Sequence, residues 1–233
     1  MANCAAWVDT VTMESELSHQ QNAVLHYKIT YPQFSGTYFQ RMLCELNCLY
    51  KAKAQALQQG RVRELFCQAT SEVAGAQTQE TENNARMPRY DLAVTFQTPF
   101  NQNGVLSLYF DQYEFTGGAH GNTVRCSESW NLQRGSCLLM RDLFARQVNY
   151  KAYLIEHINK QIATQMETDD SIYFDDYACL TVRYFNERQF YLSPEGIVVY
   201  YQQYEIAPYA TGIPTFVIPY SQGCISMPGS GCR

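Results

Sequence analysis

The alternation of hydrophobic and polar residues predicts two strands followed by two helices in the N-terminal part of the chain, with Val8–Met13 as a short first strand. Val24–Tyr31 alternates with a period of two, which predicts a strand with one buried face. Apolar residues then recur at helical spacing over Tyr38–Gln59, which predicts an amphipathic helix. Gly60 is expected to end or kink this helix, and the apolar stripe continues from Val62 to Val73 through a second helix.

The middle of the chain changes from helical to strand periodicity. An Asn-Gly pair separates Tyr90–Thr98 from Val105–Phe115, and this turn signal between two alternating runs predicts a hairpin. A third alternating run begins at Val124, beyond a turn that contains three glycines. We therefore expect Tyr90–Met140 to form an antiparallel meander.

The last third of the chain combines one helix with a second group of strands. Asn149 is expected to cap a helix that runs to about Glu167 and lies across the sheet. Gln189–Leu192 and Ile197–Gln203 are predicted to form a hairpin, and Thr215–Tyr220 the last strand. This order of elements predicts an α+β fold, with helices packed on one side of a mostly antiparallel sheet.

The changes of pattern predict two sub-domains and a tail. Residues 1–86 are expected to form a strand–helix companion domain, and residues 87–221 a domain of antiparallel sheet plus helix. The boundary follows Gly75–Arg86, a polar stretch without an apolar stripe that is expected to be a loose connection. Residues 222–233 are rich in glycine and serine and are expected to form a flexible tail.

The composition argues against several classes of function. The chain has 233 residues, 46% of them hydrophobic, and a net charge of −5 without a basic stripe, so nucleic acid is not an expected partner. No run approaches the ~18 apolar residues of a membrane span. The N-terminus lacks the basic and then apolar pattern of a signal peptide, so the chain as written is expected to be cytoplasmic.

The cysteines and motifs predict neither a metal nor a cofactor. Nine scattered cysteines, an odd number, fit reduced thiols better than a disulfide framework. Cys44 and Cys48 lie one helical turn apart, but no CxxC or HxxxH pattern supplies the two further ligands of a zinc site. No Walker loop, Rossmann glycine pattern, nucleophile elbow or HExxH motif occurs.

Two loops carry the candidate binding site. In Tyr113–Thr123, glycines that surround a histidine permit a sharp turn and a nest of backbone N–H groups. In Tyr204–Pro214, two prolines stiffen a loop whose tyrosines could anchor a partner. We expect the two loops to lie side by side on a rigid platform. The candidate binding residues are Thr116, Gly117, Gly118, His120, Tyr204, Pro208 and Tyr209.

Other interpretations of these loops remain open. The glycines could simply provide positive φ angles beside a packed His120, and the tyrosine hydroxyls could tie the second loop to the sheet. Catalysis by His120 would require a second group held against the imidazole. Asp111, Glu114 and Glu205 are candidates for that group, and their spacing along the chain does not decide between them.

The same loops are part of a set of motifs that resembles a known family. The motifs are Tyr113–Thr123, Arg141–Phe144, Phe190–Leu192 with Glu195–Ile197, Gln203–Pro214 and Phe216–Tyr220. In this order they are similar to the signature of a bacterial domain family first described as having unknown function. The segment before Tyr90 resembles the companion domain that often precedes this family.

The resemblance implies a binding module of the bacterial envelope. The family includes the extracellular, lysozyme-binding half of the anti-sigma-V factor and a non-catalytic region in front of some peptidoglycan deacetylases. It implies a non-catalytic module whose ligand is a protein, possibly lysozyme, or a glycan, and whose relatives are extracytoplasmic. The chain lacks the receptor's transmembrane helix and sigma-binding segment, so an anti-sigma role is not expected.

Two alternative functions and the oligomeric state are left open. One alternative is a hydrolase that uses His120 with a nearby carboxylate. The other is an intracellular interaction protein of unknown partner, which the cysteine content favours.

Overall fold

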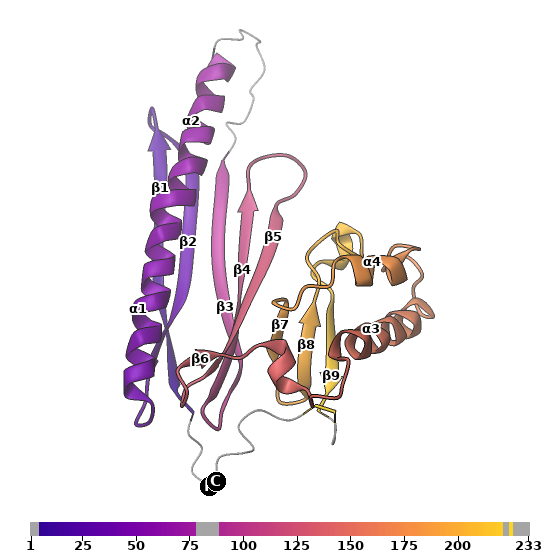
Figure 1. The fold of residues 1–233 in the computed structure, drawn as a ribbon. Helices are drawn as coiled ribbons and strands as arrows, with labels where there is room; N and C mark the ends of the chain where they lie inside the picture. The colour runs from indigo at the N-terminus through magenta and orange to yellow at the C-terminus, as the bar shows by residue number, and fades with distance from the viewer. Residues whose placement is uncertain (1–4, 78–88, 221–223, 226–233) are drawn as a thin grey trace.

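The computed structural model describes residues 5–77, 89–220 and 224–225, which form two sheets with associated helices (Figure 1). The first sheet has six strands in the order β1-β2-β3-β4-β5-β6, and the second has the order β7-β8-β9. Strands of the first sheet are β1 (Trp7–His19), β2 (Asn22–Ser35), β3 (Tyr90–Gln102), β4 (Val105–Phe115), β5 (Asn122–Asn131) and β6 (Ser136–Cys137). Strands of the second are β7 (Phe190–Leu192), β8 (Gly196–Tyr200) and β9 (Thr215–Pro219). The helical elements are α1 (Gln40–Leu57), η1 (Gln58–Val62), α2 (Arg63–Gln77), η2 (Met140–Leu143), α3 (Tyr150–Met166), α4 (Tyr177–Arg183) and η3 (Tyr209–Thr211).

The predicted α+β class is confirmed, and the sheets are mostly antiparallel. Among the described strands, the pairing is antiparallel at every junction apart from that of β2 with β3. A parallel pair requires a crossover connection, and the α1–η1–α2 helix lies within that connection. The two predicted N-terminal helices are thus what brings β3 parallel to β2.

Gly60 interrupts the long helix without ending it. It lies in the five-residue π-helical turn η1, through which α1 continues into α2. A π turn widens the backbone locally and is one of the usual causes of a change in helix direction. The buried face of α1, which includes Leu46 and Tyr50, packs with Leu106 and Leu108 of β4 in one core cluster.

The predicted meander is confirmed. β3 pairs with β4, and β4 pairs with β5, each in antiparallel register. Asn103 and Gly104 take φ angles of 54° and 74° between β3 and β4. Positive φ at both central residues is what a tight hairpin turn of the I′ type requires.

The second sheet packs between α3 and the first sheet. All five residues of β8 are buried, as expected for a central strand. Its Ile197 and Val199 share a core cluster with Leu154 and Ile158 of α3. The helix predicted after Asn149 is confirmed, but it lies on this smaller sheet rather than across the meander.

Buried polar and aromatic contacts join the two sheets. The backbone N–H of Leu192 in β7 donates to Ser107 Oγ of β4 at 2.9 Å. The rings of Tyr109 in β4 and Tyr191 in β7 lie 4.8 Å apart. The second sheet is therefore fixed against the face of the first sheet that α1 leaves uncovered.

The helix α4 was not predicted from the sequence. It has only seven residues, too few for a clear apolar period. Tertiary contacts hold it in place: Thr181 is fully buried, and its carbonyl oxygen accepts a hydrogen bond from Tyr201 Oη at 2.9 Å.

The division into domains stays a prediction. Residues 78–88, which include the expected boundary at residue 86, lie outside the described residues, and the six-stranded sheet takes strands from both sides of it. Of the expected tail, residues 224–225 alone are described. Ile225 is buried and forms an isolated β-bridge with Phe144. Within the described ranges, no helix combines the length and apolarity that a membrane crossing needs.

Candidate functional site

The two candidate loops meet. The His120 ring, in the β4–β5 connection, stacks on the ring of Tyr209, with centroids 3.8 Å apart and planes 18° from parallel. The Tyr204 ring lies 5.8 Å from that of Tyr209, and its hydroxyl oxygen is 3.4 Å from His120 Nε2. The predicted juxtaposition of segments more than 80 residues apart in the chain is therefore confirmed.

Hydrogen bonds fix the orientation of the His120 ring. Its Nδ1 lies 3.1 Å from the carbonyl oxygen of Gly121. A carbonyl oxygen can only accept, so Nδ1 carries the proton and donates. In the neutral ring Nε2 then keeps its lone pair and can accept from the Tyr204 hydroxyl. This tautomer is assigned from the network, and it leaves both ring nitrogens in use.

The three carboxylates considered as partners for His120 are held by other groups. Arg61 donates to Glu114 from Nε at 2.9 Å and from Nη2 at 2.7 Å, and this guanidinium holds the pKa of Glu114 below its usual value. Asp111 and Glu205 accept hydrogen bonds elsewhere in the structure. Within the described residues, no carboxylate is hydrogen-bonded to His120, and no cluster of His, Cys, Asp and Glu is placed to hold a metal.

The remaining candidate residues divide into those that line a hollow and those that shape the backbone. A pocket of about 340 Å³ lies beside the stack. Gly117 and Gly118 have φ angles of 95° and 93°, which L-residues rarely adopt. Pro208 directly precedes the short helix η3 that carries Tyr209. The pocket is lined by Arg61, Gln68, Glu114, Thr116, His120, Gly121, Asn122 and Tyr204.

Two glutamines that the sequence analysis missed attach the second loop to the edge of β5. The backbone N–H of Arg125 donates to Gln202 Oε1 at 2.9 Å, and Gln202 Nε2 donates back to the Arg125 carbonyl at 2.7 Å. The N–H of Thr123 donates to Gln203 Oε1 at 2.8 Å. These amide side chains form hydrogen bonds with backbone groups at the free edge of β5, as a neighbouring strand would.

This arrangement corrects one predicted element. Ile197–Gln203 was expected to be a continuous strand, but β8 ends at Tyr200. The two glutamines that follow use their side chains, not their backbone, to pair with β5. The Gln-Gln dipeptide before Tyr204 is the one sequence feature that accompanies this pairing with β5. A polar pair at the end of a strand is too common for the pairing to be predicted from it.

Tyr204 has a strained backbone. Its φ angle is 66°, in the left-handed region that is uncommon for bulky residues, and the residue is 50% exposed. A tight turn holds it there, because the Gln202 N–H donates to Glu205 Oε2 at 2.7 Å and the Glu205 N–H donates to the Gln202 carbonyl at 3.2 Å. Strain of this kind often accompanies a functional position.

Comparison with known proteins matches two parts of the chain to family models. Residues 141–221 match the model described as a protein of unknown function, DUF3298. Residues 18–123 match the model described as deacetylase PdaC. The peptidoglycan-N-acetylmuramic acid deacetylase PdaC of Bacillus subtilis (strain 168) is 22% identical over 133 residues, which cover 56% of this chain and 28% of the deacetylase. The match thus spans about a quarter of that relative.

Solved structures share the fold of the whole described chain. A DUF3298-family protein from Bacteroides fragilis has a TM-score of 0.68 at 21% identity, with 94% of this chain and 92% of that chain covered. A DUF3298-family protein from Pseudomonas aeruginosa has a TM-score of 0.58 at 17% identity, with 95% of both chains covered. At such identities the likeness concerns the fold alone. The predicted resemblance to a family of unknown function and to peptidoglycan deacetylases is confirmed, and the link to the anti-sigma-V factor stays a prediction.

Proposed function

We propose that the chain is a non-catalytic binding module whose ligand is a protein or glycan of the bacterial envelope. The contact surface is formed by His120, Tyr204 and Tyr209, with Thr116 and the Gly117–Gly118 turn at its rim. The observation that carries this proposal is the aromatic group that two distant loops build at the surface. No covalent chemistry is required of it.

The aromatic group is suited to binding because it is built before a ligand arrives. Tyrosine offers rigid contact area with a polar tip at low cost in side-chain entropy. The stack on His120 and the pairing of Gln202 with β5 restrict the loop in advance. A preorganised surface loses less conformational entropy on binding, so more of its interaction free energy contributes to affinity. The strain at Tyr204 is consistent with a residue kept for contact rather than for stability.

The comparisons support a ligand from the bacterial envelope. The Bacillus subtilis relative is named as a deacetylase that acts on peptidoglycan. The resemblance to the lysozyme-binding receptor adds lysozyme as a candidate protein ligand. An envelope location for this chain is part of the same proposal.

Two purified ligands test the proposal, namely lysozyme and soluble peptidoglycan fragments titrated by calorimetry. Binding of one of them is expected to weaken about tenfold or more in Tyr204→Ala and Tyr209→Ala, because aromatic anchors carry a large share of interface energy. Tyr38→Ala is the matched control, because Tyr38 is 49% exposed and lies outside both loops. All three variants are expected to melt near the wild-type temperature.

Two results would count against the binding site. If neither ligand binds the wild-type chain, the envelope assignment fails. If Tyr38→Ala weakens binding as much as Tyr209→Ala does, the ligand does not depend on the loops.

A second candidate is an interaction protein inside the cell, which one observation favours. The cysteines in the described part of the chain are unpaired, and all of these but Cys224 are exposed. Exposed thiols persist in a reducing compartment. Thiol counting by mass spectrometry on protein from the native host distinguishes the two, because paired cysteines would argue for export.

A further inference from the structure

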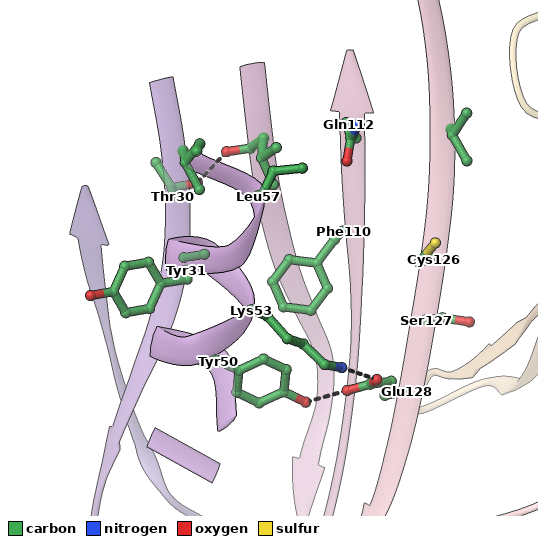
Figure 2. A pocket seen from close by; sticks show the side chains of 14 residues that line it. Thr30, Tyr31, Tyr50, Lys53, Leu57, Phe110, Gln112, Cys126, Ser127 and Glu128 are labelled. Carbon is green, nitrogen blue, oxygen red and sulfur yellow. Dashed lines mark hydrogen bonds and ion pairs between the residues drawn. The ribbon is translucent and has the colours of Figure 1, made fainter. Parts of the chain in front are cut away.

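An apolar groove lies between α1 and strands β2 to β5 (Figure 2), and it shares no residue with the loops that carry His120, Tyr204 and Tyr209, here called the aromatic loops. Its volume is about 480 Å³, within the range of roughly 300–1,000 Å³ that small-molecule sites occupy. Aliphatic and aromatic side chains form most of its surface. They come from β2 (Ile29, Tyr31), α1 (Tyr50, Ala54, Leu57), β3 (Val94), β4 (Phe110) and β5 (Val124).

The groove is open because the long helix covers one half of the sheet. In Figure 1 the α1–η1–α2 helix runs along β1 and β2. Its α1 part packs on Leu106 and Leu108 of β4, whereas the start of β5 lies away from the helix. Val124 of β5 is consequently 43% exposed, and Phe110 of β4 is only partly buried. An exposed apolar strip beside a hollow of this size is the usual form of a ligand site.

A fixed ion pair closes one end of the groove. Lys53 of α1 donates to Glu128 Oε1 of β5, as Figure 2 shows below the ring of Phe110. The other oxygen of Glu128 accepts from Tyr50 Oη at 2.8 Å, and Tyr50 Oη in turn accepts from Trp130 Nε1 at 2.9 Å. This chain of hydrogen bonds holds the carboxylate in place and keeps the ammonium at the groove.

Lys53 has donors to spare at this position. An ammonium carries three N–H donors. Within the described residues, Lys53 Nζ is hydrogen-bonded to Glu128 alone, and its side chain is 48% exposed. Two N–H groups are thus free to receive an acceptor from a ligand.

Among the described residues that line the groove, Lys53 is the one cation. Arg61 lies eight residues beyond Lys53, about 12 Å along the helix. Its Nε and Nη2 donate to Glu114, and its Nη1 donates to Glu64. A ligand in the groove would therefore place its anionic group at Lys53 and its apolar body along Leu57 and toward Arg61.

We propose that this groove binds a small amphiphilic carboxylate, with the carboxylate on Lys53 and the apolar body between Leu57, Phe110 and Val124. This site is distinct from the aromatic loops and does not depend on their function. The apolar surface of the groove favours an apolar body, and the positive charge and free N–H donors of Lys53 favour a carboxylate at that end.

A series of three straight-chain compounds that share an apolar tail tests the site: decanoate, decanol and decylamine, each titrated below micelle formation by calorimetry. Decanoate is expected to bind at one site about tenfold more tightly than decanol, because of a charge-assisted hydrogen bond. Decylamine is expected to bind least. Lys53→Met is expected to remove the preference for the acid.

Two further variants separate the charge from the shape of the groove. Glu128→Gln releases Lys53 from its carboxylate partner and is expected to tighten decanoate binding. Val124→Asp places a carboxylate on the exposed apolar strip and is expected to abolish it, with little risk to folding. Tyr209→Ala is the control and is expected to leave decanoate affinity unchanged.

Three outcomes would overturn the proposal: no saturable binding of decanoate, equal affinity for the acid and the alcohol, or a preference for the acid that Lys53→Met leaves unaltered. Loss of decanoate binding in Tyr209→Ala would instead place the ligand at the aromatic loops and would equally refute a separate site.

Discussion

Removing the side chain of Gln202 should release the free edge of β5 and loosen the candidate binding surface. Gln202 makes two hydrogen bonds to the backbone of Arg125, at 2.9 and 2.7 Å. Gln203 makes one to the N–H of Thr123, at 2.8 Å. The pair therefore provides an internal comparison between two bonds and one at neighbouring positions.

The expected cost follows from the number of bonds lost. A net contribution of about 0.5–1.5 kcal/mol for each hydrogen bond gives about 1–3 kcal/mol for Gln202→Ala and about 0.5–1.5 kcal/mol for Gln203→Ala. The loss at Gln202 is moderated because the Arg125 carbonyl also accepts from Tyr200 Oη at 3.3 Å. Gln55→Ala, at an exposed position of α1, is the control and is expected to change stability by less than about 0.5 kcal/mol.

Two independent measurements test this prediction. Denaturant unfolding gives the free energy of each variant. Amide hydrogen exchange followed by NMR reports which N–H has lost its acceptor. The Arg125 amide is expected to exchange faster in Gln202→Ala, and the Thr123 amide in Gln203→Ala, each without a matching change in the other.

The reasoning would be refuted by unchanged protection of Arg125 in Gln202→Ala, because that N–H would then have another acceptor. It would also fail if Gln203→Ala lowered the free energy of unfolding more than Gln202→Ala does, since the expected loss increases with the number of hydrogen bonds to the β5 backbone. Equal acceleration of both amides would mean that the loop detaches as a unit.

Three other substitutions test separate parts of the structure. The left-handed backbone at Tyr204 costs a non-glycine residue about 1–2 kcal/mol, and glycine avoids this cost. Tyr204→Gly should therefore unfold at a higher denaturant concentration than Tyr204→Ala, and equal unfolding midpoints would contradict backbone strain at this position. A hydrogen bond to Asp91 raises the pKa of His26 in the folded state. The contribution of protonated His26 to stability is therefore complete below its unfolded-state pKa of about 6.5 and is lost as the pH rises through its folded-state pKa. The stability gap between wild type and His26→Gln should therefore shrink toward about pH 9, and a gap that widens there would refute this. Tyr50→Phe removes the acceptor of Trp130 Nε1 and should cost about 1–3 kcal/mol by denaturation; no loss would imply another acceptor.

The sequence alone determined the type and approximate position of most elements. The helical period before Gly60, the Asn103-Gly104 turn and the cap at Asn149 are local signals, because capping, turn formation and periodic burial depend on neighbours within a few residues. The same local chemistry pointed to the glycine turn around His120 and the proline-stiffened loop of Tyr209 as unusual segments.

Tertiary structure alone decided how these elements are arranged. The parallel pairing of β2 with β3, the separate second sheet and the position of α3 on it result from packing between distant segments. The Gln202 side chain that completes the edge of β5 and the Lys53–Glu128 pair that closes the apolar groove link residues more than 70 positions apart. No local pattern encodes such contacts, because they form only when burial of the whole core brings distant polar groups within hydrogen-bonding distance.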